Sequence, residues 1–214
     1  EVHYLGNVLE KFQYDMIYHE HLYYYSLLAV ENHFSRFSMT IFDLKKIPIH
    51  GGSIRFYVTN NESKYAFQSE QVVKLRNLEL QKNYDKFSTY NLFSSEIDRT
   101  KSELNNLLSK LKKNGSKIAG YGASGRANTI MQFCGIDYQI LDYMIDDAPS
   151  KIGYFTPGSH LEIFSSEILN QTDRPEYVIV FAWSFLEEIY KKNISYLRQG
   201  GKFIIPLPEV KIYG

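Results

Sequence analysis

The last hundred residues of the chain alternate between short apolar runs and amphipathic runs. The runs typical of strands read KIAGYG, ILDYMIDD, SHLEIF, YVIVFAW and KFIIPLP, and those with a helical period read RANTIMQFC and SFLEEIYKKNISYLRQ. Alternation of strand and helix favours a parallel sheet with right-handed crossovers. We therefore predict an α/β fold in which residues 116–214 form a doubly wound parallel sheet.

A glycine-rich turn lies between the first of these strands and the helix that follows it. GYGASG places Gly120, Gly122 and Gly125 in the G-x-G-x-x-G spacing, in the strand-to-helix context that makes this pattern informative. We interpret Gly120 as the residue of the tight turn, Gly122 as the point where a ligand approaches the backbone, and Gly125 as the contact between helix and strand. Free N–H groups at the helix start favour a phosphate or carboxylate.

Polar residues near this turn are candidate ligand contacts. Arg126, Asn128 and Thr129 follow the last glycine and can donate hydrogen bonds to an anion, while Asp146 and Asp147 end the next predicted strand. An acidic residue about 20 positions after such a turn meets a ribose hydroxyl in nucleotide-binding units. The pattern indicates nucleotide binding, with a turn that only packs the helix on the sheet as the alternative.

The first sixty residues predict a helix followed by a β-hairpin. Ser26 is a suitable N-cap for the helical run SLLAVENHFSRF, and β-rich runs follow at Met39–Leu44 and Ser53–Thr59, with Gly51 and Gly52 between them. The run from Ala66 to Lys113 has a helical period, and we predict one long amphipathic helix that packs on its own sheet, with a coiled-coil partner as the alternative. Its expected contact face contains Tyr90, Phe93, Ile97, Thr100, Leu104, Leu107 and Leu111. The predicted domains are residues 1–64, a helical connector at 65–115, and residues 116–214.

A cluster of acid–base groups precedes the first predicted helix. Tyr18, His19, Glu20 and His21 are consecutive, and an imidazole beside a carboxylate suits proton transfer near neutral pH. Two other interpretations stay open: hydrogen bonds from the histidines to neighbouring backbone, and a zinc site. Zinc is disfavoured because no cysteine or third histidine lies nearby in the sequence.

The hairpin bend IHGGSIR holds two further candidates, His50 and Arg55. Its glycines would let a ligand or a neighbouring domain approach the backbone. A plain loop with a salt-bridged Arg55 explains the same residues equally well.

Charge and cysteine content exclude several classes of partner. The 24 Lys and Arg balance the 24 Asp and Glu, which argues against nucleic acid and anionic membranes as partners. The single cysteine, Cys134, cannot close an intrachain disulfide and is predicted to be a buried apolar residue. No apolar run approaches the roughly 20 residues of a membrane span, and no signal peptide is recognisable at the start. We predict a cytoplasmic location, and the opening residues read as the continuation of a longer chain.

Six segments, in order, resemble the C-terminal part of S-adenosylmethionine-dependent sugar C-methyltransferases, which methylate C3 of dTDP-linked keto-deoxysugars. They read YDMIYHEHLYYYSL, IPIHGGSIRFYV, IAGYGASGRANTIMQFCGI, YMIDDAPSKIGYFTPGSHLEI, YVIVFAWSF and GGKFIIPLPEV. The resemblance implies a Rossmann-like C-terminal domain that helps hold the nucleotide-sugar. It also implies that residues 1–64 end a class I methyltransferase domain, and that the zinc-binding and donor-binding regions lie outside this chain. The chain alone would then be inactive, and the missing domains would pack against it.

The resemblance also suggests roles for individual residues. The last histidine of YHEH, His21, matches the base that removes the C3 proton, while Glu20 would orient it and Tyr18 would donate to the developing oxyanion. That assignment is chemically sound because a hydrogen next to a ketone is acidic enough for imidazole to abstract.

The glycine turn also fits a family pattern, which covers Gly120, Gly122, Ser124, Gly125, Asn128 and Thr129. Arg126 stands where lysine is expected. We expect His21 and this turn to face one substrate. The competing functions are a non-catalytic nucleotide-sugar-binding module and, third, an NAD(P)-binding oxidoreductase domain.

Overall fold

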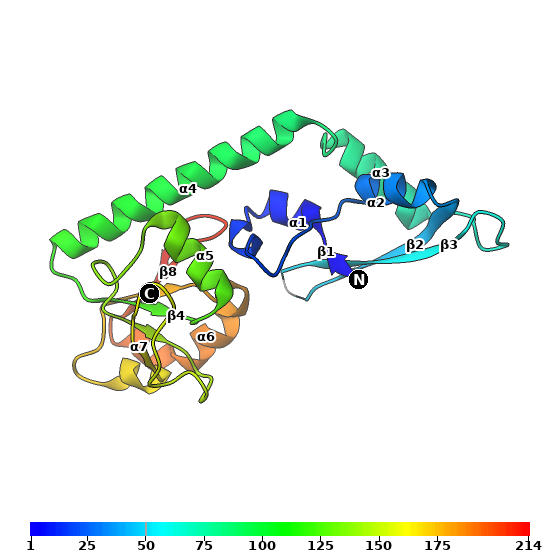
Figure 1. Ribbon diagram of the computed structural model, residues 1–214. Coiled ribbons are helices and arrows are strands. Elements are labelled where there is room, and N and C mark those ends of the chain that lie inside the picture. Colours follow the sequence, from blue (N-terminus) through cyan, green and yellow to red (C-terminus); the bar gives the residue numbers. More distant parts are fainter. Residues whose placement is uncertain (50) are drawn as a thin grey trace. The chain divides into compact units, whose positions relative to one another are not determined.

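A computed structural model describes residues 1–49 and 51–214 of the chain. The described residues form two compact units (Figure 1). Unit 1 comprises residues 1–13 and 20–96, and unit 2 comprises residues 14–19 and 97–214.

Unit 1 is built on a three-stranded antiparallel sheet in the order β1-β3-β2. Its elements are β1 (Val2–His3), α1 (Leu5–Glu10), α2 (Leu27–Ser35), β2 (Met39–Ile47), β3 (Ser53–Asn60), α3 (Glu70–Gln81) and the first part of α4 (Phe87–Lys113). The predicted helix and both hairpin strands are confirmed, and β2 continues three residues beyond Leu44. Buried side chains of these elements, among them Leu27, Ile41 and Ile54, form one hydrophobic core.

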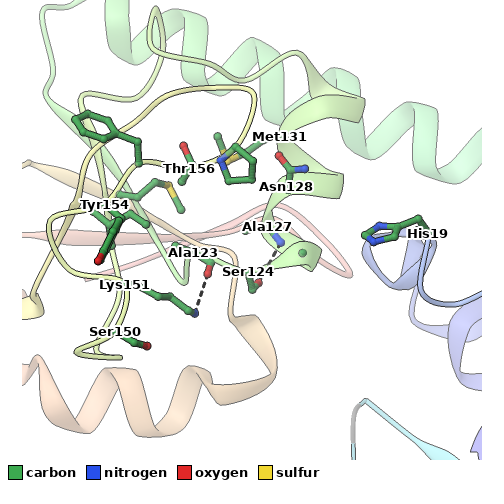
Figure 2. A pocket seen from close by; sticks show the side chains of 15 residues that line it. His19, Ala123, Ser124, Ala127, Asn128, Met131, Ser150, Lys151, Tyr154 and Thr156 are labelled. Carbon is green, nitrogen blue, oxygen red and sulfur yellow. Dashed lines mark hydrogen bonds between the residues drawn. The ribbon is translucent and has the colours of Figure 1, made fainter.

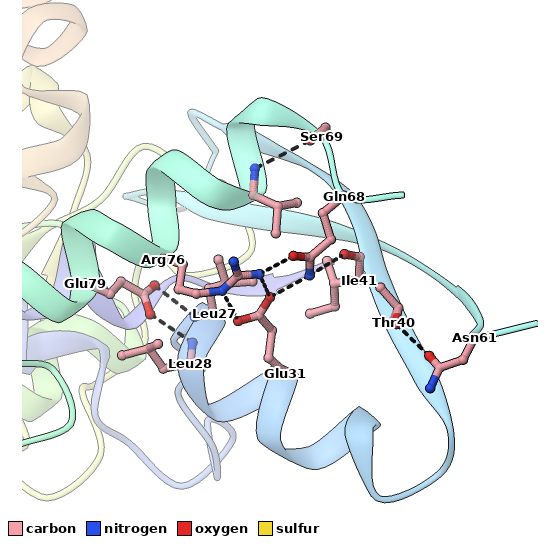
Figure 3. Close-up of polar contacts among 11 residues, drawn as sticks. Leu27, Leu28, Glu31, Thr40, Ile41, Asn61, Gln68, Ser69, Arg76 and Glu79 are labelled. Carbon is pink, nitrogen blue, oxygen red and sulfur yellow. Dashed lines mark hydrogen bonds and ion pairs between the residues drawn. The ribbon is translucent and has the colours of Figure 1, made fainter. Parts of the chain in front are cut away.

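The start of α2 is fixed by two separate acceptors. The Ser26 hydroxyl accepts a hydrogen bond from Ala29 N–H at 3.1 Å, as predicted for an N-cap. Glu79 of α3 is fully buried, and its carboxylate accepts from the N–H groups of Leu27 at 2.8 Å and Leu28 at 2.9 Å (Figure 3). The carboxylate of Glu79 in α3 therefore satisfies two N–H groups at the start of α2 that have no acceptor within their own helix.

The prediction of one long helix over Ala66–Lys113 was wrong, because two helices occupy that region. The break lies at Asn83, which has a φ of 55°, a left-handed conformation that asparagine adopts more readily than most residues. The following Tyr84 is buried and donates from its hydroxyl to Glu10 at 2.6 Å. The predicted contact face of α4 is confirmed at Thr100, Leu104 and Leu111, which are buried, and Leu108 is buried in addition.

Unit 2 contains, among its described residues, a six-stranded sheet in the order β6-β5-β4-β7-β8-β9. Its elements are η1 (Tyr14–Met16), the rest of α4, β4 (Ile118–Tyr121), α5 (Gly125–Cys134), β5 (Tyr143–Ile145), β6 (Ile163–Phe164), η2 (Ser166–Asn170), β7 (Tyr177–Val180), η3 (Trp183–Phe185), α6 (Leu186–Lys192), α7 (Ile194–Arg198), β8 (Lys202–Ile205) and β9 (Lys211–Tyr213). Neighbouring strands from β6 to β8 are parallel, as predicted.

Two features of unit 2 differ from the predictions. The edge strand β9 was missed, and it pairs antiparallel with β8. The predicted helix over SFLEEIYKKNISYLRQ is interrupted at Asn193, whose side-chain amide donates to the Ile189 carbonyl at 2.8 Å. Asparagine competes in this way with the helical hydrogen-bond ladder.

The sheet of unit 2 is covered by helices on both faces (Figure 1). Alternate strand residues such as Tyr121, Val178 and Phe203 pack with Ile189 of α6 and Tyr196 of α7 in one core. Helix α5 covers the opposite face. Because β4 pairs with β5 on one side and β7 on the other, the chain changes direction across the sheet at β4, which is where open α/β sheets bind ligands. Among the described residues, no helix combines the length and apolar character needed to cross a membrane.

Candidate functional site

The glycine turn joins β4 to α5 and has the predicted context, but the glycines divide their roles differently. Gly120 lies inside β4, where a Cβ would come within 2.4 Å of Met144 Sδ and 2.7 Å of the Phe181 ring. Gly122 is the turn residue, with a φ of 97° and Ala182 Cβ 2.7 Å from the position a Cβ would take. A Cβ at Gly125 would meet only ordinary contacts. Close packing thus requires Gly120, and backbone conformation requires Gly122.

Asp146 holds the turn in place from the end of β5. Its Oδ2 accepts from the Ala123 N–H at 2.8 Å and pairs with Lys151 Nζ at 2.9 Å, and its Oδ1 accepts from the Ala148 N–H. Lys151 also donates to the Ala123 carbonyl at 2.8 Å. Both carboxylate oxygens of Asp146 are therefore engaged with protein groups, so its ribose contact stays a prediction.

A cavity of about 390 Å³ lies beside the turn (Figure 2). Ser124 and Asn128 line it from the start of α5, where the Ser124 hydroxyl caps the helix by accepting from Ala127 N–H at 3.3 Å. Thr129 does not line the cavity and donates its hydroxyl to the Gly125 carbonyl. The full lining comprises His19, Ala123, Ser124, Gly125, Ala127, Asn128, Met131, Met144, Ser150, Lys151, Tyr154, Phe155, Thr156, Pro157 and Ile163.

Several cavity residues were missed by the sequence interpretation. His19 is directed toward the start of α5 (Figure 2), and Tyr154 and Phe155 are exposed aromatic residues of the loop between β5 and β6. The sequence carried one signal for this loop: APSKIGYFTPGSH combines glycine, proline and aromatic residues directly after the two aspartates. Such a segment is typical of a binding loop.

Asp147 lines a second and smaller cavity of about 260 Å³, together with Tyr121 and Gly122. It accepts hydrogen bonds from Ser166 Oγ at 2.6 Å and from the Tyr121 hydroxyl, and it pairs with Lys192 Nζ at 2.7 Å. Burial acts to raise the pKa of Asp147, but these three donors outweigh it and lower that pKa. Burial and the hydrogen bond to Asp147 raise the pKa of Tyr121 to about 12.

Arg126 is held by protein groups. Its Nε and Nη2 contact Asp15 Oδ2 at 2.8 and 2.6 Å, and its Nη1 donates to Ser184 Oγ at 3.1 Å. The guanidinium also lies over the Trp183 ring, 4.9 Å from the ring centroid. Two guanidinium nitrogens therefore donate hydrogen bonds to protein groups and the third lies in ion-pair contact with Asp15, so the anion contact of Arg126 stays a prediction.

The YHEH segment forms neither helix nor strand, and the boundary between the two units falls within it. In unit 2, the rings of Tyr18 and His19 meet edge-on, with their centroids 6.1 Å apart. The Tyr18 ring also lies beside Gly125, where a Cβ would be 3.6 Å from Tyr18 Cε2. In unit 1, His21 lies 5.6 Å from the His3 ring, and Glu20 is exposed. The expectation that His21 and the glycine turn face one substrate stays a prediction.

In the hairpin bend, the salt-bridged alternative holds for Arg55. Its guanidinium donates to Glu1 at 2.6 and 3.0 Å. The close approach expected at the glycines is made by the chain itself, because a Cβ at Gly52 would overlap the Asn7 side chain. His50 lies outside the described residues.

Cys134 is buried as predicted, and burial raises the pKa of its thiol. No group of three or more metal-ligating side chains occurs in the part of the chain that the structure describes.

Comparison with known proteins connects these features to a family. Residues 48–208 match the family described as the C-methyltransferase C-terminal domain. The chain is also 28% identical over 212 residues to the C-methyltransferase NovU of Streptomyces niveus, an alignment that covers 99% of the chain and 50% of NovU. The chain therefore spans about half the length of this curated relative. The match of residues 48–208 includes the glycine turn and every cavity residue except His19, and on that basis the chain belongs to the C-methyltransferase C-terminal domain family.

Proposed function

We propose that this chain is the substrate-holding and base-carrying part of an S-adenosylmethionine-dependent C-methyltransferase that acts on a dTDP-linked keto-deoxysugar. The observation that supports it best is the cavity at the start of α5, which lies inside the segment matched by the family. The chain length relative to NovU supports the view that other regions of the enzyme bind the methyl donor.

The cavity suits one part of a nucleotide-sugar. Backbone N–H groups at the start of α5, the Ser124 hydroxyl and the Asn128 amide provide hydrogen-bond donors for an anion such as a diphosphate. Tyr154 and Phe155 offer aromatic surface for a planar base or a sugar. Lys151 lines the cavity as well, and its ammonium group is paired with Asp146 at 2.9 Å.

The proposed chemistry is proton abstraction next to the ketone. In this proposal, His21 takes the C3 proton, Glu20 orients the imidazole, and Tyr18 donates to the oxygen on which negative charge develops. S-adenosylmethionine, when bound, supplies an electrophilic methyl group. None of the described residues is assigned to that donor.

Proton abstraction by His21 can be measured separately from methyl transfer. The full-length protein, incubated in D₂O with a dTDP-linked keto-deoxysugar, is expected to exchange the C3 hydrogen for deuterium. His21→Ala should lower both exchange and methyl transfer by about 100-fold or more, the range of a lost general base, while dTDP affinity in calorimetry stays unchanged. His33→Ala, at an exposed position of α2, is the matched control. Full exchange in His21→Ala would remove this residue from the role of base.

Titration distinguishes the competing functions. Binding of dTDP without deuterium exchange in the unaltered protein would favour a non-catalytic nucleotide-sugar module. Binding of NAD⁺ with no response to dTDP would favour an oxidoreductase domain.

A further inference from the structure

A buried carboxylate lies three residues before the YHEH segment. Asp15, in η1, has a side chain that is 0% exposed. A buried carboxylate is costly unless it is paired and hydrogen-bonded. Asp15 Oδ2 meets this requirement through groups that come from distant parts of the chain, whereas the buried Oδ1 has no hydrogen-bond partner.

Two hydrogen-bond donors and one ion-pair contact converge on one oxygen of Asp15. Arg126 Nε and Nη2 approach Oδ2 at 2.8 and 2.6 Å, and Trp183 Nε1 donates to the same oxygen at 2.9 Å. Arg126 belongs to the first turn of α5, and Trp183 follows β7. The contact therefore ties the segment before YHEH to the two elements that begin where β4 and β7 end.

The partners of Asp15 are themselves held in fixed orientations. The Arg126 guanidinium lies over the Trp183 ring and donates to Ser184, so both side chains have contacts besides Asp15. A planar guanidinium with a fixed fork of donors defines geometry more strictly than an ammonium group would. The cluster of Asp15, Arg126 and Trp183 can thus hold a neighbouring residue of the chain in one position.

The residue whose position follows from this cluster is Tyr18. One turn of chain separates it from Asp15, and its ring lies against Gly125, directly before Arg126. A Cβ at position 125 would lie 3.6 Å from the ring, an ordinary van der Waals distance, which places the Tyr18 ring beside the first residue of α5. The contacts of Asp15, three residues earlier, therefore hold the segment that carries Tyr18 beside the start of α5.

We infer that Asp15, Arg126 and Trp183 are positioning residues for the methyl-transfer reaction, and that they act by holding Tyr18 at the start of α5. This inference rests on the proposed function and gives Arg126 a role different from direct contact with the substrate anion. The cluster acts on the catalytic rate constant through Tyr18 and leaves nucleotide binding largely unaffected.

A double-mutant cycle in the full-length protein tests this role. Asp15→Asn keeps the shape of the side chain and removes its charge, and it should lower kcat about 10- to 100-fold, the scale of a misplaced reacting group. Tyr18→Phe should lower kcat by a similar factor. If Asp15 acts through Tyr18, the double variant should be no slower than Tyr18→Phe alone. The dissociation constant for dTDP should change less than threefold.

Multiplicative losses in the double variant would overturn the inference, because a loss of folded protein or a separate role gives additive free energies. If Asp15→Asn does not fold, Trp183→Phe replaces it in the same cycle, since it removes the indole donor to Asp15 and keeps an aromatic ring beside Arg126. Asp173→Asn, which breaks an exposed pair with Lys117 in the same unit, is the control and should leave kcat unchanged. Absence of transfer by the unaltered protein would overturn the proposed function, and this inference with it.

Discussion

Asp147 shows how one side chain can join several elements of a sheet. It follows β5 and receives donors from β4, from η2 and from the last residue of α6, namely Tyr121, Ser166 and Lys192. The raised pKa of Tyr121, about 12, keeps its hydroxyl a donor at any physiological pH. The carboxylate form of Asp147 is therefore the form that the fold stabilises.

The lowered pKa of Asp147 predicts a pH-dependent contribution to stability. A group whose pKa is depressed by folding stabilises the folded state above its unfolded value, here near 3.8, and loses that contribution as pH falls through the folded pKa. Asp147→Asn should lower the melting temperature at pH 7, and the difference from the unaltered protein should shrink as pH falls from 5 toward 3. Asp173→Asn controls for the loss of one surface charge. A difference that stays constant with pH would show that ionisation of Asp147 does not contribute.

The spacing of the glycines in the sequence predicts the turn but not the structural role of each glycine. Gly120 is required by Met144 and Phe181, which face it from β5 and from the end of β7. Those contacts depend on strand register across the sheet, which no local pattern contains. The contact between Arg126 and Asp15 could not be predicted from a local pattern either, because 111 residues separate the two in the sequence.

At the level of elements, α2 depends on an acceptor that belongs to another helix. Glu79 receives the N–H groups of Leu27 and Leu28 and also the Tyr4 hydroxyl at 3.0 Å, so all three partners are donors. Burial raises the pKa of Glu79, although the hydrogen bonds act in the opposite direction. An amide in its place would bring a donor against a donor.

Glu79→Gln is therefore expected to destabilise unit 1 by about 1–3 kcal/mol, the cost of leaving a buried donor unsatisfied. Urea unfolding followed by circular dichroism measures this change as a lower midpoint. Glu70→Gln, an exposed position of the same helix paired with Lys74, should stay within about 0.5 kcal/mol of the unaltered protein. Equal midpoints for the two variants would contradict the proposed dependence of α2 on Glu79.

Element prediction from the sequence succeeded where periodicity was strong and failed where a single residue ends a helix. The strands β4, β7 and β8 are buried apolar runs, and all three were recognised. The breaks at Asn83 and Asn193 were missed because helical periodicity continues on both sides of each asparagine. The strand β9 has three exposed residues, and its identity depends on the open edge of β8.

At the level of the whole molecule, the segment matched by the family extends over both compact units. The family match begins in the hairpin of unit 1 and ends after β8 of unit 2. The glycine side of the candidate site was predictable, because its motif is contiguous in sequence. The loop that carries Lys151, Tyr154 and Phe155 was not assigned to the site, because its part in the cavity depends on how the β5–β6 connection folds back over α5.

Cys134 closes α5 and is the only cysteine of the chain. Its side chain is 4% exposed, the Tyr14 hydroxyl lies 3.4 Å from the sulfur, and burial raises the pKa of the thiol. A thiol-specific reagent can therefore attack only after this region opens. We expect alkylation of Cys134, followed by peptide mass spectrometry, to be far slower in buffer than in concentrated urea. Labelling at the same rate in both would show that the thiol is accessible in the native state.

If labelling is slow, the alkylation rate of Cys134 measures how often this region opens. Ligands that fill the cavity at the other end of α5 should then lower that rate, so a single sulfur atom would report whether the cavity is occupied without any knowledge of the reaction product.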